Sequence, residues 1–370
     1  MKFVTLFLKT ENVHLLKDVG MIPYHIMKDH GADSSVVTYR NSDEYSYADN
    51  EVRGLKLEFI KRTRFGRTVD GMLYLIKNAR RIDVLNVYHL NLSSFFYEII
   101  YRLFNRRGRI YLKLDMNPRG LISCLKKDPT GMIKRATIRM ADIASVETTG
   151  MCRRLGKFYG DKILYIPNGC YTGEAGDCEC GDTVTEKEDV ILTVGNLGTS
   201  DKATNVLLEA YAEFLKEVPE SSWKLKLIGS IDEAFKPYIR DYFVRYPKLK
   251  ERVVFTGPIT DKAELNEEYR KAKIFTLPSL SESFGIVLVE AAVRGCYLIT
   301  SDMVPAGYDV SDRFKNGESV KAGDVSALAK AFKRMCNERH DWEGTAKRTA
   351  AYVSAAFEWN SIINRLYKRL

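Results

Sequence analysis

The chain has 370 residues, which is enough for two domains of roughly 150 to 200 residues each. Hydrophobic residues make up 45% of the sequence and charged residues 28%, as in an ordinary globular protein. No stretch approaches about 20 apolar residues, so no transmembrane helix is expected, and the run FVTLFL before Lys9 is too short for a signal peptide. The seven cysteines, including the pair Cys178 and Cys180, favour free thiols over a disulfide framework or a zinc site.

The positive charge is concentrated in the first half of the chain. Residues 1–170 contain 29 Lys and Arg against 17 Asp and Glu, a net charge of +12, whereas the remainder has 28 against 31, a net charge of −3. One interpretation is a face that contacts anionic lipid and a lipid-linked acceptor; the alternative is a solvated basic face. No recognised nucleic-acid motif accompanies the charge, so a nucleic-acid partner is not expected. The basic residues, with phenylalanines interleaved, are Lys56, Lys61, Arg62, Arg64, Arg67, Arg80, Arg81, Arg102, Arg106, Arg107 and Arg109.

Short apolar runs alternate with amphipathic helices along the chain, which is typical of parallel sheets flanked by helices. Between two such series lies a polar, Gly-containing segment at 174–189, which predicts a linker. We therefore predict an α/β fold with Rossmann-like domains at 1–173 and 190–352, and a C-terminal helix at about 353–370 that packs back on the first domain. Strands are expected at 3–8, 34–39, 55–60, 84–90, 110–115, 143–148 and 163–169, and then at 191–196, 223–229, 252–257, 273–279 and 296–302.

A lysine stands at the start of the helix expected at 203–218. It follows the loop 196–201, in which Ser200 or Asp201 is the expected N-cap. A positive charge at a helix N-terminus opposes the helix dipole, so Lys202 is better tolerated where an anion lies between it and the helix amides. The alternative is a lone exposed lysine.

Two carboxylates lie around the start of a short apolar helix near the C-terminus. Glu282 follows the strand at 273–278, and Glu290 lies inside the helix expected at 286–294. Apolar residues surround Glu290 on that helix, so an ionised carboxylate there needs a hydrogen-bonding partner. The partner is either a ligand or an arginine from elsewhere in the chain, unless the side chain reaches solvent.

The residues between these carboxylates suit a ligand. Ser283, Phe284 and Gly285 leave backbone amides free at a helix N-terminus, which attracts anions and hydroxyl oxygens, and Gly285 permits close approach to the backbone. Amides with a carboxylate on either side fit a polyhydroxylated, phosphorylated ligand such as a nucleotide sugar.

The segment from Pro278 to Ala291 resembles the E-x7-E signature of retaining GT-B glycosyltransferases, a family that includes glycogen synthase-like and phosphatidylinositol mannosyltransferase-like enzymes. Further matching segments occur in the family's order, and the resemblance is strongest from about Asp142 onward. It implies GT-B architecture, in which two Rossmann-like domains face a central cleft. The other matching segments are IPNG at 166–169, LTVG at 192–195, LIG at 227–229, VFTG at 254–257, Gly295, Gly317, Gly323 with Asp324, and Phe357 with Trp359.

The resemblance implies a metal-independent hexosyltransferase that needs no cofactor and retains the anomeric configuration of its nucleotide-sugar donor. It implies that Lys202 binds the donor diphosphate, Glu282 the sugar hydroxyls and Glu290 the ribose diol, with Lys202 and Glu282 as the catalytic residues. Front-face attack is thought to operate in this family, so no nucleophile is assigned. The implied donor-binding residues are Gly195, Asn196, Lys202, Gly257, Glu282, Ser283, Phe284, Gly285, Ile286 and Glu290.

Three departures from the family pattern affect this assignment. Relatives commonly have an arginine where this chain has Asn196, so a second cation on the diphosphate is missing. The acceptor-side loop that often contains a histidine has Lys113 and Asp115, which either work in the cleft or form an ion pair. The double-glycine loop after the first strand is reduced to Gly20, a third acceptor-side position.

A UDP-sugar is the expected donor, and a lipid-linked saccharide or glycan for cell-surface polysaccharide or glycolipid synthesis is the expected acceptor. The chain is expected in the cytoplasm, with peripheral contact to the inner face of the membrane through the basic N-terminal domain. A non-catalytic protein that binds a sugar nucleotide, or a scaffold on the same fold, is the alternative.

Overall fold

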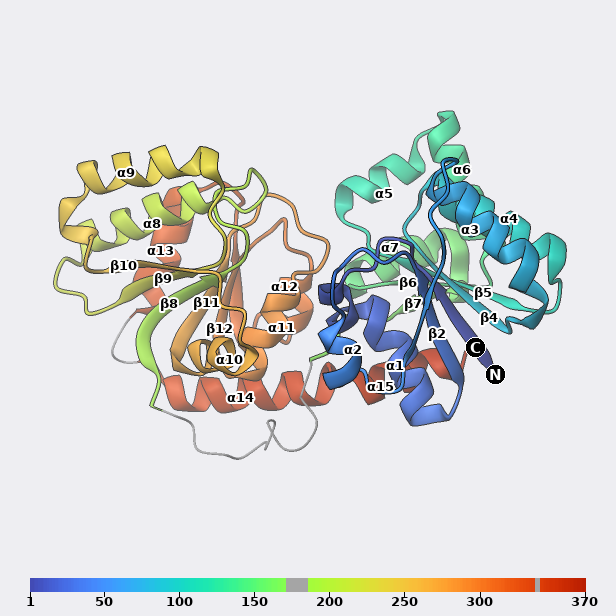
Figure 1. Ribbon diagram of the computed structural model, residues 1–370. Helices are drawn as coiled ribbons and strands as arrows, with labels where there is room; N and C mark the ends of the chain where they lie inside the picture. Colours follow the sequence, from blue (N-terminus) through green and yellow to red (C-terminus); the bar gives the residue numbers. More distant parts are fainter. Residues whose placement is uncertain (171–185, 337–339) are drawn as a thin grey trace. The chain divides into compact units, whose positions relative to one another are not determined.

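The computed structural model describes residues 1–170, 186–336 and 340–370. The chain forms two compact units, unit 1 (Met1–Asp177 with Glu358–Leu370) and unit 2 (Cys178–Phe357) (Figure 1). Most of the linker predicted at 174–189 lies outside the described residues, as do Cys178 and Cys180. Each unit contains a parallel sheet flanked by helices, which confirms the predicted α/β fold with two Rossmann-like sheets.

The sheet of unit 1 has seven strands in the order β3-β2-β1-β4-β5-β6-β7, all parallel. Its central strands are buried on both faces, as their near-continuous apolar sequences predict. The strands are β1 (Lys2–Leu6), β2 (Asp33–Thr38), β3 (Lys56–Phe59), β4 (Val84–Tyr88), β5 (Arg109–Leu114), β6 (Ile143–Val146) and β7 (Ile163–Tyr165).

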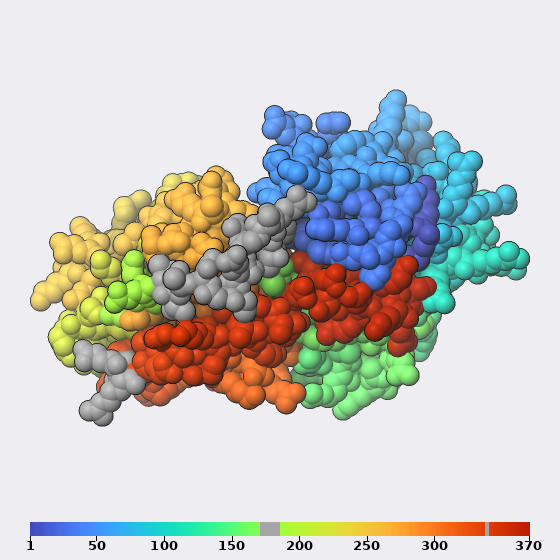
Figure 2. All heavy atoms as spheres, turned by 90° about the horizontal axis from the view of Figure 1, so that it is seen from below, coloured from blue at the N-terminus to red at the C-terminus, as the bar shows by residue number. Residues whose placement is uncertain are grey.

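Alternate residues of each strand point into two separate cores. Val4 packs with α3, α4, α6 and α7 on one face of the sheet, and Phe3 packs with α1 and α15 on the other. Figure 2 shows the C-terminal residues of unit 1, in red, against N-terminal residues in blue, where His30 stacks on Tyr367. The helices of unit 1 are α1 (Asp18–His30), α2 (Ser46–Asn50), α3 (Arg67–Asn78), α4 (Leu92–Phe104), α5 (Pro118–Leu125), α6 (Pro129–Met140), α7 (Thr149–Tyr159) and α15 (Trp359–Tyr367).

The sheet of unit 2 has six parallel strands in the order β10-β9-β8-β11-β12-β13. Helices α8 and α13 pack on its apolar core through residues such as Phe214 and Phe332. The strands are β8 (Glu188–Val194), β9 (Lys224–Ile228), β10 (Val253–Gly257), β11 (Ala272–Leu277), β12 (Tyr297–Ser301) and β13 (Gly317–Val320). The helices are α8 (Thr204–Glu217), α9 (Lys236–Arg245), α10 (Lys262–Lys271), α11 (Ile286–Val293), α12 (Ala306–Val310), α13 (Val325–Met335) and α14 (Trp342–Ala356).

Two local predictions were wrong or incomplete. The N-cap of α8 is neither Ser200 nor Asp201 but Ala203, in the left-handed region at φ 51°. The edge strand β13 was not predicted, because it contains Glu318 and Ser319 in place of an apolar run. Within the described ranges, no helix is both long and apolar enough to cross a membrane.

Candidate functional site

The predicted donor residues of unit 2 lie after the carboxyl ends of its parallel strands, where open α/β sheets bind ligands. The loop after β8 holds Lys202, and the loop after β11 holds Glu282. A backbone hydrogen bond from Leu280 N–H to the Asp201 carbonyl, 2.7 Å long, joins the two loops. Sheet order therefore brings together residues that are 80 positions apart in the sequence.

Lys202 and Glu282 form an ion pair, with Nζ 2.6 Å from Oε2. Both side chains are partly exposed, at 27% for Lys202 and 16% for Glu282. The buried Ser279 hydroxyl lies 3.5 Å from the same carboxylate oxygen. A partly exposed pair is held only weakly, so either charge can turn to a ligand at low cost.

Glycine lets the backbone approach this site closely. Gly285, at φ 85°, is the N-cap of α11, and a Cβ there would lie 2.9 Å from the Leu277 side chain. Among the described residues, none accepts a hydrogen bond from the N–H groups of Phe284 and Gly285. Phe284 itself is buried, with 2% of its surface exposed, so the ligand-binding role of the two amides stays a prediction.

Glu290 lies on α11 and is half-buried. Its carboxylate accepts a hydrogen bond from the Tyr269 hydroxyl of α10 at 3.1 Å. Burial and then the nearby Glu290 raise the pKa of Tyr269 well above its ordinary value, so the phenol remains a donor. The protein partner of Glu290 is therefore a tyrosine and not the arginine considered from sequence.

Asn196 occupies the position where relatives commonly have an arginine. Its Oδ1 accepts a hydrogen bond from the Ser230 hydroxyl at 3.0 Å, which joins the loops after β8 and β9. The same loops approach so closely that a Cβ on Gly229 would lie 1.8 Å from the Gly195 carbonyl oxygen, so only glycine fits at position 229. Gly257 ends β10, and its carbonyl accepts the N–H of Gly229 at 2.9 Å. Asn196 thus fixes the loop without adding a charge.

The predicted acceptor-side residues of unit 1 lie in different environments. Lys113 is fully buried, and its Nζ lies 3.3 Å from Glu147 and 3.5 Å from Asp18. It also donates to the carbonyl of Ile166 at 3.3 Å. The amide of Asn168 donates to Glu147 at 2.6 Å, so this cluster joins β5, β6, the start of α1 and the segment after β7.

Burial and charge set the protonation states of this cluster. Burial alone lowers the pKa of Lys113, but the carboxylates of Glu147 and Asp18 outweigh it and raise that pKa above its ordinary value. Burial raises the pKa of Glu147 to about 8, against the opposing effect of Lys113. The Lys113 ammonium therefore stays charged, whereas the Glu147 carboxyl holds a proton more tightly than an ordinary glutamate does.

The other two residues predicted on the acceptor side are Asp115, which is exposed, and Gly20, which is tightly packed. Asp115 is exposed immediately after β5. Gly20 lies in the first turn of α1, where a Cβ would come within 2.2 Å of the Leu15 carbonyl oxygen. Glycine at position 20 is thus required for packing against the preceding turn.

The part of the chain that the structure describes holds no group of three or more His, Cys, Asp or Glu side chains placed to bind a metal ion. One pocket of about 420 Å³ in unit 2 is lined by Glu186, Lys187, Lys273, Trp342 and Glu343, none of which is a predicted donor residue.

Comparison with known proteins matches residues 188–338 to the family described as glycosyl transferases group 1. The chain is 26% identical over 236 residues to a D-inositol 3-phosphate glycosyltransferase of Nocardia farcinica, with 61% of this chain and 51% of that protein covered. It is 25% identical over 213 residues to a phosphatidyl-myo-inositol mannosyltransferase of Mycolicibacterium smegmatis, with 56% and 52% covered. The chain thus spans about half the length of these curated relatives.

Among solved structures, Anabaena HepE in complex with UDP is similar, with a TM-score of 0.74, 16% sequence identity, and 100% of this chain and 99% of that chain covered. At this identity the likeness concerns the fold, and it confirms the predicted GT-B fold.

Proposed function

We propose that the chain transfers a sugar from a nucleotide-sugar donor, with retention of anomeric configuration, because residues 188–338 match the family described as glycosyl transferases group 1. The observation that carries the proposal is the Lys202–Glu282 pair beside the free amides of Phe284 and Gly285. These groups supply one cation, one carboxylate and two N–H donors at the carboxyl end of a parallel sheet. That set matches a diphosphate joined to a polyol.

In the proposed donor complex, the Lys202 ammonium leaves Glu282 and binds the diphosphate. It then stabilises the negative charge that develops on the leaving nucleoside diphosphate. The released Glu282 carboxylate accepts hydrogen bonds from the sugar hydroxyls. The backbone amides of Phe284 and Gly285 donate hydrogen bonds to the oxygens of the sugar. The Lys202–Glu282 ion pair is thus exchanged for two contacts with one ligand.

Glu290 is proposed to bind the ribose diol. Tyr269 fixes one of its oxygens at 3.1 Å, which orients the carboxylate and leaves the other oxygen for a hydroxyl donor. Asn196 brings no charge to the diphosphate, so leaving-group stabilisation rests on Lys202 and on nearby backbone amides.

The proposed donor is a UDP-sugar, which agrees with the UDP bound in the HepE structure. The proposed acceptor is a lipid-linked saccharide or glycan, and the Mycolicibacterium relative is named for a phosphatidyl-myo-inositol substrate. We assign acceptor contact to unit 1, with exposed Asp115 as the polar group and with Lys113 and Gly20 shaping the surface behind it. The chain then acts in the cytoplasm at the inner face of the membrane.

A panel of nucleotides and nucleotide sugars tests this proposal by thermal shift and by slow hydrolysis, each with and without a chelator. Stabilisation by UDP, and hydrolysis of one UDP-sugar that the chelator does not change, are the expected results. The anomer of the product, assigned by NMR before mutarotation, tests retention. Binding of a nucleotide without turnover, even with acceptor supplied, would favour the non-catalytic alternative, and no shift with any nucleotide would contradict the donor site.

A further inference from the structure

Lys187 of unit 2 is a half-buried lysine that holds backbone carbonyls. It immediately precedes β8, and among the residues that the structure describes no carboxylate pairs with it. Its Nζ donates instead to the carbonyls of Ala272 at 2.8 Å, Arg270 at 3.0 Å and Tyr269 at 3.5 Å. Burial lowers the pKa of Lys187 from its ordinary value, and these carbonyls replace the water that a buried ammonium loses.

The carbonyls that Lys187 contacts lie where α10 ends and β11 begins. Carbonyls in the last turn of a helix have no partner inside the helix, and a cation there complements the negative end of the helix dipole. The buried thiol of Cys296, just before β12, also donates to the carbonyls of Tyr269 at 3.1 Å and Ala272 at 3.3 Å. Two donors, placed at the beginnings of the strands on either side of β11, thus hold the end of α10.

Tyr269 joins this helix end to the proposed ribose contact. Its side chain is fully buried, and its ring packs on that of Phe275 in β11, with the ring centroids 5.8 Å apart. Its hydroxyl donates to Glu290 Oε2 at 3.1 Å. Because close packing fixes the side-chain rotamer, a shift of the Tyr269 backbone would move the hydroxyl and with it the Glu290 carboxylate. Lys187 is therefore linked to Glu290 through a single residue.

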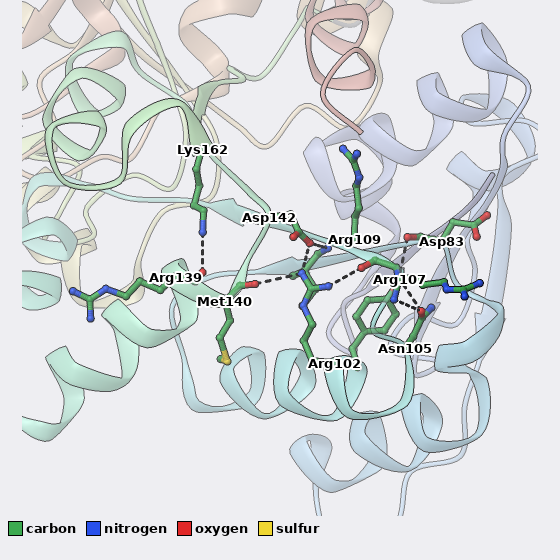
Figure 3. Close-up of polar contacts among 12 residues, drawn as sticks. Asp83, Arg102, Asn105, Arg107, Arg109, Arg139, Met140, Asp142 and Lys162 are labelled. Atoms are coloured by element: carbon green, nitrogen blue, oxygen red, sulfur yellow. Dashed lines mark hydrogen bonds and ion pairs between the residues drawn. The ribbon is translucent and has the colours of Figure 1, made fainter.

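A lysine of unit 1 holds a helix end in the same way but in the other unit. Lys162 donates to the carbonyls of Arg139 at 2.8 Å and Ile138 at 3.5 Å, in the last turn of α6 (Figure 3). Burial lowers the pKa of Lys162 as it does that of Lys187. The predicted donor residues all lie in unit 2, so Lys162 is the matched control for the loss of a buried lysine at a helix end.

From these contacts we propose that Lys187 is a positioning residue for the ribose of the donor nucleotide. Lys187 holds the last turn of α10, and Tyr269 transmits that position to the Glu290 carboxylate, which accepts hydrogen bonds from the ribose hydroxyls. Lys187 itself binds no part of the ligand. The inference rests on the ribose contact proposed for Glu290 and extends it to the residue that keeps this carboxylate in place.

The orientation of a carboxylate decides whether it can accept hydrogen bonds from both hydroxyls of a ribose diol. A site built to hydrogen-bond a hydroxyl rejects an analogue that lacks it, because the polar group of the site is left unpaired. The unaltered chain should therefore bind UDP at least about tenfold more tightly than 2′-deoxy-UDP. If Lys187 orients Glu290, removal of Lys187 reduces this preference and not only the stability of unit 2.

Calorimetric titration of the full chain with UDP and with 2′-deoxy-UDP tests the inference. The quantity measured is the ratio of the two dissociation constants, expected to be at least about ten in the unaltered chain. K187M should lower this ratio to less than about three, by weakening UDP binding while leaving 2′-deoxy-UDP binding nearly unchanged. K187R keeps the charge and the N–H donors at this position and should retain most of the ratio.

Three further variants separate positioning from a general loss of stability. K162M removes the matching lysine of unit 1 and should leave the ratio unchanged. K202M removes the cation proposed to bind the diphosphate, which both nucleotides carry, so it should weaken both and leave the ratio unchanged. K187M should change the ratio little in a Y269F background, because both substitutions act through the same hydrogen bond to Glu290.

Circular dichroism and thermal melts show whether each variant folds. If K187M does not fold, K187Q takes its place in the comparison. The glutamine amide keeps two N–H donors for the carbonyls at the end of α10 but lacks the positive charge. K187Q should therefore fold and give a ratio between those of the unaltered chain and Y269F.

Three results would overturn the inference: an unchanged ratio in folded K187M or K187Q, an equal fall of the ratio in K162M, or additive effects of K187M and Y269F. Equal binding of UDP and 2′-deoxy-UDP by the unaltered chain would reject the ribose contact, and the inference with it, but would leave the diphosphate contact of Lys202 in place. Absence of UDP binding to the unaltered chain would instead contradict the proposed donor itself.

Discussion

Each unit places a lysine beside carboxylates near the carboxyl end of its sheet, but the two lysines differ in environment. Lys113 of unit 1 is fully buried between two carboxylates and a carbonyl, whereas Lys202 of unit 2 is 27% exposed and has one carboxylate partner. A buried charge cannot leave its partners without a large desolvation cost, but a partly exposed one can exchange them for a ligand. The difference favours a structural role for Lys113 and agrees with the donor-binding role proposed for Lys202.

Replacement of each lysine by methionine separates these roles most strongly. K113M removes the buried cation that contacts Asp18 and Glu147 and should lower the free energy of unfolding by about 3 kcal/mol. K202M should change it by less than about 1 kcal/mol, because that ion pair is partly exposed. Urea denaturation of both variants measures the difference, and equal losses in stability would contradict the comparison.

Activity should show the opposite order. K202M removes the cation from the leaving diphosphate and should reduce transfer or donor hydrolysis about 10²- to 10³-fold. K315M is a suitable control, since Lys315 pairs with Asp312 on the surface of the same unit. Full activity of K202M would remove Lys202 from the donor site.

Replacement of Glu282 should leave UDP binding intact but lower the turnover of a UDP-sugar. E282A frees Lys202 from its carboxylate partner, so the affinity for UDP itself should be unchanged or slightly higher. Turnover of a UDP-sugar should fall about 10²-fold, because the contact with the sugar hydroxyls is lost. UDP affinity from calorimetry and initial rates measure the two effects. A parallel loss of both would mean that Glu282 holds the loop and not the sugar.

The unit 1 cluster should make stability depend on pH. The pKa of Glu147 is raised to about 8 in the folded chain from an ordinary value of 4.5, so the folded state binds its proton more tightly than the unfolded state. The resulting stabilisation is fully present below pH 4.5 and is lost as pH rises toward 8. E147Q does not titrate, so its stability relative to the unaltered chain should rise across this window, by up to about 1.4 kcal/mol per pH unit.

Denaturation curves of E147Q and the unaltered chain at several pH values between 5 and 8 measure this effect. A difference in stability that stays constant with pH would show that Glu147 is ionised throughout.

The smallest expected effect concerns Glu290. Y269F removes the hydroxyl that hydrogen-bonds the carboxylate and should cost about 1 kcal/mol of stability, with a several-fold loss in UDP affinity. Loss of stability alone would indicate that Tyr269 and Glu290 form a packing contact between α10 and α11 and do not shape a ribose site.

The sequence predicted most of the parallel strands, because apolar runs such as KIFTLP and ILTVG have the length of buried strands and are bounded by Gly or Pro. It also placed Lys202 and Glu282 on strand-to-helix loops, although only the sheet order showed that they form a pair. The short edge strand β13 was missed because Glu318 and Ser319 give it no apolar signal.

The sequence pattern did not predict which residues far apart in the chain form ion pairs or hydrogen bonds. Lys113 was predicted beside Asp115, but its buried pairs with Asp18 and Glu147 depend on the positions of α1 and β6. Tyr269 was not foreseen as the partner of Glu290, since that contact depends on the packing of α10 against α11. The N-cap of α8 at Ala203 also depends on contacts that the sequence does not show. The Thr204 hydroxyl accepts the Gly198 N–H, and the Asp201 carbonyl accepts the Leu280 N–H, so the loop before α8 is held by other hydrogen bonds.

Calorimetric titration of UDP into the unaltered chain and into K202M tests the donor site most directly. The account predicts saturable binding of UDP to the unaltered chain and at least about tenfold weaker binding to K202M, with the two stabilities within about 1 kcal/mol of each other. Equal affinity in the two proteins would contradict the assignment of the diphosphate to Lys202, and absence of UDP binding to the unaltered chain would contradict the UDP-sugar donor.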